Sequence, residues 1–397
     1  MRILLISWEY PPVVEGGLAR HVRKLSEQLV ADGVEMHVLT RGGGHLPAQQ
    51  DRHGVIVHRV REPAYPKDVN AFVRWVDAMN ADMRAMGAEL FERHDFDLVH
   101  SHDWLVAGTA EPLARANDRP WLVTVHATEF GRHQGWVDKY PQSHIHAVER
   151  EMVRGADHVI TCSNYMRGHV GSTFGVARRS ISVIPNGIDP RDLDHGDEDL
   201  AALRARYAEP DQRLVLLVGR LVYEKGFHLA LEALAGVRRR FGDVRFVVAG
   251  TGTAEKELKT QARSLGLTRH GTFLGWVGDD RLHSLYRIAD LCIVPSIYEP
   301  FGLVALEAMA SGTLCIVADT GGLREVVPGD GRVGRRFRSR DAQSLAKILE
   351  DALGDDAARE RVVAEAREHV LQFDWAMVAH ETRKLYGQLI PVDISAA

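Results

Sequence analysis

The hydrophobic pattern of the chain alternates between short apolar runs and longer stretches with helical spacing. In the first half, apolar residues recur every three or four positions from Leu18 to Leu29 and again from Val69 to Leu90, which predicts two amphipathic helices. Short apolar runs predict strands at Arg2–Ser7, Glu35–Leu39, Val55–Val60, Asp97–His100, Trp121–His126 and Asp157–Cys162. Such alternation of strands and helices predicts a parallel sheet with helices on both faces.

The same alternation starts again in the second half, with predicted strands at Leu214–Val218, Val244–Ala249, Thr272–Leu274, Asp290–Pro295 and Thr313–Ala318. Between the halves, Pro185–Pro190 has the composition of a turn. We therefore expect two doubly wound α/β domains, residues 1–187 and 188–397, with ligands at the carboxyl ends of the strands in a cleft that both domains face. The pattern leaves open whether the last helix, about residues 375–389, packs back on the first domain.

Composition narrows the class of partner. The 397 residues include 49 Lys and Arg against 54 Asp and Glu, a net charge of −5, so no basic excess indicates nucleic acid or an anionic membrane. Neither a secretory signal nor a run long enough to cross a membrane is apparent. Cys162, Cys292 and Cys315 have no paired spacing and are interpreted as buried thiols in a reducing compartment. We expect a cytoplasmic protein without stable membrane insertion, and its oligomeric state is left open.

Two acids flank a predicted strand-to-helix junction in the second half. Glu299 precedes the helix start and Glu307 lies in its second turn, from which its side chain leans back toward the same mouth. A helix start also presents free backbone N–H groups that attract anions, here those of Phe301, Gly302, Leu303 and Val304. A ligand with hydroxyls and phosphates, such as a nucleotide sugar, fits this set. Solvated acids near a helix start, which the dipole favours anyway, explain it equally well.

Cations and glycines follow two other predicted strands of the second half. Arg220 and Lys225 come after the first strand and can converge as phosphate-binding groups, although two solvated loop cations are an even alternative. Gly250 and Gly252 follow the next strand, where they either allow a close approach to a nucleotide or merely turn the chain.

In the first half, Glu15-Gly16-Gly17 separates the first strand from the first helix. Paired glycines there allow a ligand close to the backbone, but they lack the spacing of the dinucleotide-binding fingerprint, which argues against a dehydrogenase. Asp103 and His126 lie at the ends of predicted strands and are expected to face the cleft. His100, His102, His126 and His133 are candidate metal ligands, but a metal site is disfavoured because their spacing matches no compact zinc motif.

Taken together, these segments resemble the retaining nucleotide-sugar glycosyltransferases of family 4, which have two Rossmann-like domains in the GT-B arrangement. The matching elements are Glu15-Gly-Gly17, His126, Arg220 with Lys225, and the pair Glu299 and Glu307 around Phe301-Gly-Leu303, in the family's order over nearly the whole chain. Ser7–Pro12, His102-Asp-Trp104 and His126–Glu129 are most similar to bacterial glycogen-synthase-like α-glucosyltransferases. One departure is Arg324, which replaces the proline common before the acid of a Gly-Gly-x-x-Glu motif that ends at Glu325.

The resemblance implies a role for each candidate. The first domain would bind the acceptor and the second the donor, ADP-glucose or UDP-glucose. Glu299 would hold sugar hydroxyls, Glu307 the ribose, and Arg220 and Lys225 the departing diphosphate. His126 would orient the sugar, with Asp103 on the sugar or acceptor side. Donor contacts are expected from Gly16, Gly17, Gly250, Gly252, Val277, Phe301, Gly302, Leu303 and Val304.

The resemblance also implies the reaction: transfer of glucose to an α-1,4-glucan or related oligosaccharide with retention of configuration, without a metal or any cofactor. The alternative is transfer of mannose or another hexose to a lipid or small acceptor. A nonenzymatic nucleotide-sugar sensor is disfavoured because His126 and the cation pair are both present. The base of the nucleotide and the acceptor are left open.

Overall fold

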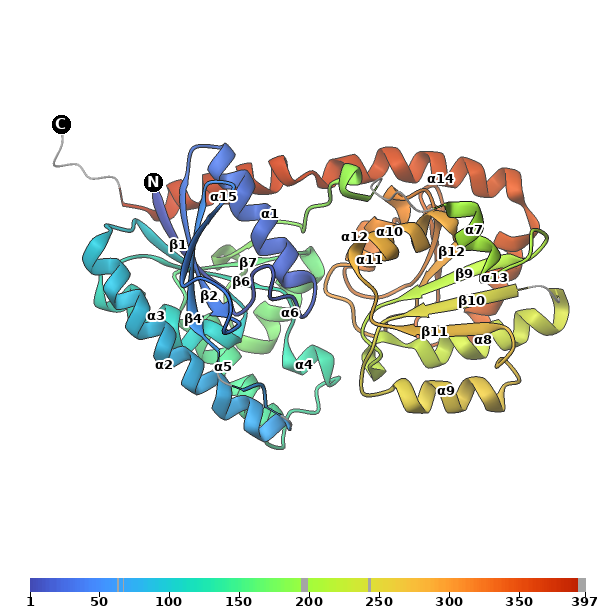
Figure 1. The fold of residues 1–397 in the computed structure, drawn as a ribbon, viewed down its shortest axis with the longest axis horizontal. Coiled ribbons are helices and arrows are strands. Elements are labelled where there is room, and N and C mark those ends of the chain that lie inside the picture. Colours follow the sequence, from blue (N-terminus) through green and yellow to red (C-terminus); the bar gives the residue numbers. More distant parts are fainter. Residues whose placement is uncertain (63, 67, 194–198, 242–243, 392–397) are drawn as a thin grey trace. The chain divides into compact units, whose positions relative to one another are not determined.

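The protein, described here by a computed structural model, divides into two compact units. The description covers residues 1–391 except residues 63, 67, 194–198 and 242–243. The first unit comprises Met1–Gly187 and Trp375–Ala397, and the second comprises Ile188–Asp374 (Figure 1). The last helix is therefore part of the first unit, although it follows the whole second unit in sequence.

An eight-stranded sheet forms the centre of the first unit, with strand order β3-β4-β2-β1-β5-β6-β7-β8. All neighbouring strands are parallel except β3 and β4. Every residue of β5 and β6 is buried, as expected for central strands covered on both faces. The strands are β1 (Arg2–Ile6), β2 (Glu35–Gly42), β3 (Gln49–Arg52), β4 (Val55–Arg61), β5 (Leu98–His102), β6 (Trp121–Val125), β7 (His158–Thr161) and β8 (Ile181–Val183).

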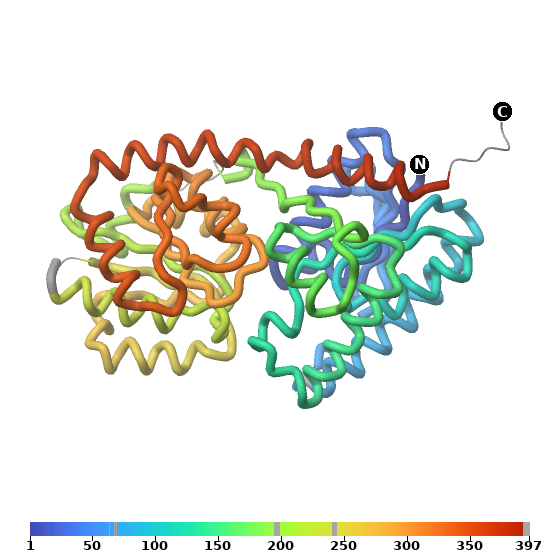
Figure 2. Tube along the Cα trace, turned by 180° about the vertical axis from the view of Figure 1, so that it is seen from behind, coloured from blue at the N-terminus to red at the C-terminus, as the bar shows by residue number. Residues whose placement is uncertain are grey.

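Helices cover this sheet. The α-helices are α1 (Gly17–Ala31), α2 (Val69–Arg93), α3 (Ala107–Ala116), α4 (Glu129–Arg132), α5 (Gln142–Gly155), α6 (Asn164–Phe174) and α15 (Trp375–Leu389), and two 3-10 turns are η1 (Trp104–Val106) and η2 (Arg178–Ser180). α15 lies beside α1 (Figure 2), and its residues Trp375, Val378 and Leu385 share a buried cluster with Val22. The Tyr386 hydroxyl, also on α15, lies 2.7 Å from His100 Nδ1 in β5, so a buried polar contact adds to the apolar packing.

The second unit has a six-stranded, fully parallel sheet with order β11-β10-β9-β12-β13-β14. In Figure 1, α8 and α9 lie on one side of this sheet and α10 and α11 on the other. The strands are β9 (Arg213–Val218), β10 (Val244–Ala249), β11 (Gly271–Gly275), β12 (Leu291–Val294), β13 (Leu314–Ala318) and β14 (Arg335–Phe337). The helices are α7 (Leu200–Ala205), α8 (Phe227–Phe241), α9 (Glu255–Ser264), α10 (Asp279–Ile288), α11 (Leu303–Ala310), α12 (Leu323–Val326), α13 (Ala342–Gly354) and α14 (Asp356–Val370), with 3-10 turns η3 (Pro190–Leu193), η4 (Tyr223–Lys225) and η5 (Leu371–Phe373).

Both sheets confirm the predicted α/β class and all eleven predicted strands, to within two or three residues at their ends. Three strands were missed: β3, β8 and β14. β3 is made of Gln49-Gln-Asp-Arg52, and its antiparallel edge position departs from the parallel sheet that was expected. The three predicted thiols are buried and free. None of the helices within the described residues combines the length and apolar character that crossing a membrane requires.

Candidate active site

In the second unit, most of the predicted donor residues lie in the loops that follow β9 and β12 or in the first two turns of α11. These strands are hydrogen-bonded neighbours, and the order of the sheet reverses between them because β10 lies on the other side of β9. Loops at such a reversal leave a crevice at the carboxyl ends of the strands, where α/β proteins bind ligands. The structure thus gathers Arg220, Lys225, Glu299 and the start of α11 at one edge of this sheet.

An ion pair joins the two loops. Lys225 Nζ lies 2.7 Å from Glu299 Oε2, and the Ser296 hydroxyl donates to the same oxygen at 3.0 Å. Glu299 is only 9% exposed. The backbone reinforces the contact, because Ile297 N donates to Glu224 O at 2.8 Å and Gly322 N donates to Glu299 O at 2.9 Å. The carboxylate and the ammonium are therefore partly desolvated and held in one arrangement, which strengthens their interaction relative to a surface pair.

Arg220 has a different setting from Lys225. Its side chain is 57% exposed, and its Nη2 atom lies 3.6 Å from Glu224 Oε1. Since this separation exceeds hydrogen-bond distance, the contact is an ion pair in a solvated position, which contributes little to stability. The two predicted cations are thus close in sequence but differ in exposure, since the Arg220 side chain is 57% exposed and that of Lys225 is 22% exposed.

The start of α11 is also organised around a buried polar contact. Gly302 precedes the helix with φ 123°, a conformation that a residue with a side chain rarely adopts, and Leu303 and Val304 form the first turn. Phe301 is buried edge-on against Phe373, with ring centroids 5.9 Å apart. In the second turn, Glu307 Oε2 accepts a hydrogen bond of 2.8 Å from the buried Tyr286 hydroxyl. Tyr286 was not predicted, and it fixes the orientation of the Glu307 carboxylate.

The remaining predicted donor residues lie in the loops after β10 and β11. Gly250 has φ 141°, and a Cβ there would come 1.9 Å from Gly219 O, so close packing of two loops requires this glycine. Gly252 follows in the same loop. Val277 stands between Trp276, which is 75% exposed, and the start of α10. These three residues lie at the same edge of the sheet as Lys225, but the glycines have a packing role whether or not a nucleotide binds.

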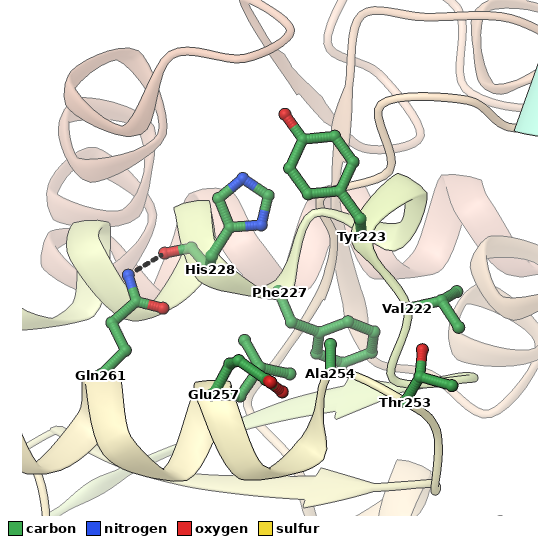
Figure 3. A pocket seen from close by; sticks show the side chains of 9 residues that line it. Val222, Tyr223, Phe227, His228, Thr253, Ala254, Glu257 and Gln261 are labelled. Atoms are coloured by element: carbon green, nitrogen blue, oxygen red, sulfur yellow. Dashed lines mark hydrogen bonds between the residues drawn. The ribbon is translucent and has the colours of Figure 1, made fainter. Parts of the chain in front are cut away.

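A pocket of about 470 Å³ opens between the starts of α8 and α9 (Figure 3). The Tyr223 and His228 rings stack at its mouth, with centroids 5.1 Å apart and planes at 10°. Gln261 Nε2 donates to His228 O at 3.0 Å, and Phe227 lies at the base. No lysine or arginine lines this pocket, so its chemistry differs from that of the Arg220–Lys225 loop.

In the first unit, Gly16 and Gly17 are exposed at the start of α1, and buried side chains hold the loop that carries them. The Glu9 carboxylate, 2% exposed, accepts hydrogen bonds from the backbone N–H groups of Glu15 and Gly16. Burial raises the pKa of Glu9 to about 7. This carboxyl group thus fixes the path of the backbone into the paired glycines.

Arg41 is the second anchor of this loop, and it is 1% exposed. Its Nη2 lies 2.7 Å from Glu15 Oε1 and its Nη1 lies 2.6 Å from Glu62 Oε1. Its Nε donates to Trp8 O at 2.9 Å, and its guanidinium carbon lies 4.3 Å from the centroid of the Trp8 ring. Neither Arg41 nor Glu9 was predicted. The groups that Arg41 holds lie 21 to 33 residues away in sequence, and those that Glu9 holds are backbone N–H groups, which leave no mark in the sequence.

Asp103 and His126 meet at the carboxyl ends of β5 and β6. Asp103, 8% exposed and at φ 58°, accepts a 2.8 Å hydrogen bond from His126 N. Burial raises the pKa of its carboxyl group to about 6. Its carboxylate is therefore directed at the backbone before α4, and it positions His126 in addition to any contact it makes with a ligand.

Two histidines, His102 and His21, lie against His126. His126 Nε2 lies 3.0 Å from His102 Nδ1, and the rings stack with planes at 17°. The His21 ring contacts both, with centroids 4.7 Å from His126 and 5.5 Å from His102. Burial lowers the pKa of His126 to about 4, and it lowers the pKa values of His21 and His102 well below the usual value. All three imidazoles are therefore neutral near pH 7.

His21, His102 and His126 are also the described residues that could hold a metal ion, since one ligand atom from each lies within 4.8 Å of the others. This trio differs from the histidines weighed from sequence: it includes His21 and leaves out His100 and His133. Neutral imidazoles suit a metal, but the His102–His126 hydrogen bond already occupies one nitrogen of each ring. The helical position of His21, one turn after Gly17, was the available sequence signal.

His133 lies apart from this trio, and its Nε2 is 3.1 Å from Glu129 Oε1. Glu129 N in turn donates to both oxygens of Glu149, at 2.8 and 3.0 Å. Glu149 is 1% exposed, and burial raises its pKa to about 8, partly opposed by Arg132. This acid therefore carries a proton near pH 7 and anchors the segment after His126.

The fold and these residues define a glycosyltransferase of GT-B type, and comparison with known proteins agrees. The family "Glycosyltransferase Family 4" matches residues 15–192, and "Glycosyl transferases group 1" matches residues 201–369. A protein named glycogen synthase from Mycobacterium tuberculosis is 40% identical over 399 residues, covering 97% of this chain and 94% of that protein. The chain belongs to glycosyltransferase family 4 and is a nucleotide-sugar glycosyltransferase.

Solved structures support the same fold. Sucrose-phosphate synthase from Thermosynechococcus elongatus matches with a TM-score of 0.84 at 25% identity, covering 98% of both chains. The catalytic domain of starch synthase IV from Arabidopsis thaliana, bound to ADP and acarbose, matches with a TM-score of 0.77 at 20% identity, covering 98% of this chain and 99% of that chain. A further relative in sequence is a glycosyltransferase from Methanocaldococcus jannaschii, which is 33% identical over 97% of this chain and 98% of its own length.

The buried Glu149 predicts a pH dependence of stability. Its folded pKa is raised above the unfolded value of 4.5, so the folded state holds a proton that the unfolded state releases, and this stabilisation is lost as pH rises through about 8. Glu9 and Asp103 add to the same trend up to about pH 7 and 6. Glu149→Gln mimics the protonated acid. We expect it to shrink the fall in Tm between pH 6 and pH 8.5 by at least about 2 °C.

The control for this measurement is Glu151→Gln, an exposed position on the same helix. It should reproduce the wild-type pH profile of Tm. Equal profiles for wild type and Glu149→Gln would show that Glu149 is ionised in the folded state throughout this range.

Proposed function

We propose that the protein is a retaining α-glucosyltransferase that transfers glucose from ADP-glucose or UDP-glucose to an α-1,4-glucan or related oligosaccharide. The observation that carries this proposal is the 40% identity to the mycobacterial glycogen synthase, which extends over 97% of the chain. The motifs of the first unit agree with it, namely His102-Asp-Trp104 and His126-Ala-Thr-Glu129. In this proposal the first unit binds the acceptor and the second binds the donor.

In this proposal, different groups of the second unit contact the diphosphate, the sugar and the ribose of the donor. The exposed guanidinium of Arg220 and the ammonium of Lys225 would neutralise the diphosphate, and the N–H groups at the start of α11 would add to them. Glu299 would accept hydrogen bonds from sugar hydroxyls while it remains paired with Lys225. Glu307, oriented by Tyr286, would accept from the ribose hydroxyls. Gly250, Gly252 and Val277 would contact the nucleotide through the loops that carry them.

The first unit would supply neutral groups. His126 has its Nε2 engaged by His102. Its Nδ1 would therefore face the sugar, and the neutral ring would place a hydrogen-bonding group there without adding charge. Asp103 would act through the backbone of His126, and Gly16 and Gly17 would allow the diphosphate close to the start of α1.

In the proposed reaction, the bond between C1 of glucose and the diphosphate oxygen breaks as an acceptor hydroxyl attacks C1 from the same face. The acceptor's proton passes to the departing phosphate oxygen, and the products are the nucleoside diphosphate and the extended glucan. The carboxylate of Glu299 is paired with Lys225, so it is not assigned as a covalent nucleophile of the kind used by retaining glycosidases. Cations and backbone dipoles would stabilise the developing charge, and no metal is required.

A second candidate is transfer to a small hydroxyl-bearing acceptor. Several relatives named D-inositol 3-phosphate glycosyltransferase are 28–30% identical, among them one from Corynebacterium jeikeium at 30% identity that covers 98% of this chain. A 2-deoxystreptamine glucosyltransferase from Streptomyces kanamyceticus is 29% identical over 87% of this chain. These identities are lower than the 40% identity to the mycobacterial protein. A small acceptor is therefore the second candidate, to be preferred if the protein does not extend glucans.

A donor and acceptor panel tests the proposal. The protein is incubated with ADP-glucose, UDP-glucose and GDP-mannose, each with a maltooligosaccharide, with inositol phosphate or with no acceptor, and nucleoside diphosphate release is measured. We expect release from a glucose donor that depends on the maltooligosaccharide, with chain extension by one glucose. Turnover of GDP-mannose alone would contradict the glucan assignment, and turnover with inositol phosphate alone would establish the second candidate.

The same assay carries a chelation control. Because cations and helix starts are proposed to handle the phosphates, activity should survive excess EDTA. Complete loss of activity that manganese or magnesium restores would contradict the proposal that the reaction needs no metal ion.

The cation pair yields a sharper prediction. Contacts to the diphosphate strengthen as it departs, so Arg220→Ala and Lys225→Ala should each lower kcat by roughly 10²- to 10³-fold. Their stabilities should differ. Arg220 is exposed, and its loss should leave Tm nearly unchanged, whereas loss of Lys225 leaves the buried Glu299 carboxylate without its cation and should lower Tm.

Lys347→Ala is the matched control, because Lys347 is an exposed cation of the same unit. It should keep wild-type kcat and Tm. If both cation variants turn over like wild type, the assignment of this loop to the diphosphate fails. If Arg220→Ala loses as much stability as Lys225→Ala, the structural distinction between the two cations fails.

A further inference from the structure

A second recess, in the first unit, gathers positive charge away from the elements that carry the proposed active-site residues. It has a volume of about 470 Å³ and lies between α6, η2, β8 and α15. Four cationic side chains line it, those of Arg167, Arg178, Arg179 and Lys384. We call it the basic recess. β8 is the edge strand of its sheet, so no further strand fills the space beside it.

The positive charge of the basic recess is poorly compensated. Its only acidic lining residue is Glu381, which lies 3.7 Å from Lys384 Nζ, too far for a hydrogen bond. Arg178 and Arg179 make no ion pair with any residue that the structure describes. Arg167 donates to the neutral amide of Asn164 at 2.8 Å. Four cations around one space repel each other, and the chain as a whole is anionic, so this cluster does not follow from composition.

One donor in this recess is both buried and unused. Arg167 Nε has no hydrogen-bond partner among the described residues. A guanidinium presents its N–H groups as a fork that matches the geometry of phosphate oxygens. An anion between Arg167 and the Arg178–Arg179 pair would relieve the repulsion and would give these groups acceptors.

The other lining residues indicate a ligand that has a carbon skeleton in addition to an anionic group. Ile181, Ile184 and Leu385 are buried and offer an apolar floor, and Gln388 offers an amide. The volume lies within the range typical of small-molecule sites. We propose that the basic recess binds a compact phosphate monoester, with the arginines on the phosphate and the floor against its carbon skeleton. The phosphate could belong to a free metabolite or to a lipid headgroup.

The basic recess is separate from the residues assigned to catalysis. Gly16, Asp103 and His126 follow β1, β5 and β6, whereas the recess is built from α6, η2, β8 and α15. Its binding is therefore measurable apart from turnover, and it does not rest on the proposed function.

The test is titration of the full-length protein with inorganic phosphate and with glucose 6-phosphate as probes, followed by calorimetry. A parallel arm uses phosphatidylcholine vesicles with and without phosphatidic acid. We expect saturable binding of one equivalent that Arg178→Ala/Arg179→Ala weakens about 10- to 100-fold, the range for losing charged hydrogen bonds. Arg178→Lys/Arg179→Lys should recover part of the affinity, because lysine keeps the charge but not the fork.

Two controls separate this site from others. Arg74→Ala/Arg84→Ala removes two exposed arginines from α2 in the same unit and should leave affinity within about twofold of wild type. Arg220→Ala/Lys225→Ala removes the proposed donor cations of the second unit. It should leave phosphate binding to the basic recess intact, because neither residue lines that recess. Binding of both soluble probes assigns a free phosphate ester, and binding only to phosphatidic acid vesicles assigns a headgroup. Absence of binding in all arms, or equal weakening by the Arg74/Arg84 control, would overturn the proposal.

Discussion

The ion pair between Lys225 and Glu299 constrains the loops at the carboxyl ends of the second unit's strands, where the candidate donor residues lie. It joins the loop after β9 to the loop after β12, at the point where the order of the sheet reverses. The backbone bonds from Ile297 to Glu224 and from Gly322 to Glu299 follow the same path, so three loops share one arrangement. A partly buried pair of this kind costs desolvation, which the Ser296 hydroxyl and the short contact offset. Such a preset charge pair suits a site that must meet a charged leaving group without reorganising.

The candidate site residues of the first unit are buried groups with shifted pKa values. Glu9 and Asp103 direct their carboxyl groups at backbone N–H groups, and burial raises the pKa of each. The imidazoles of His21, His102 and His126 lie together with lowered pKa values. The three imidazoles add no charge near pH 7, whereas Asp103, with a pKa of about 6, is largely ionised there, and Arg41 is paired with two acids. In the proposed function, the cations that meet the phosphates come from the second unit.

The sequence predicted the strands with strong apolar runs and the placement of Asp103, His126 and Lys225 at the ends of strands, because each depends on local pattern. It left open the place of the last helix, which belongs to the first unit. It missed β3, whose four polar residues carry no strand pattern, and it missed Arg41 and Tyr286. Those side chains look like an ordinary strand arginine and an ordinary helix tyrosine. Their roles appear only when distant segments meet, as Tyr286 meets Glu307 and Arg41 meets Glu15. The pairing of Lys225 with Glu299 was hidden for the same reason, although both residues had been singled out.

We propose that this arrangement transfers glucose to a glucan with retention of configuration as the nucleoside diphosphate departs. The most direct measurement is the anomeric configuration of the new linkage, read by proton NMR on the product formed from an α-configured nucleotide-glucose and a maltooligosaccharide. We expect an α-1,4 linkage on the extended chain. A β linkage would contradict retention, and release of free glucose without chain extension would contradict glucan synthesis.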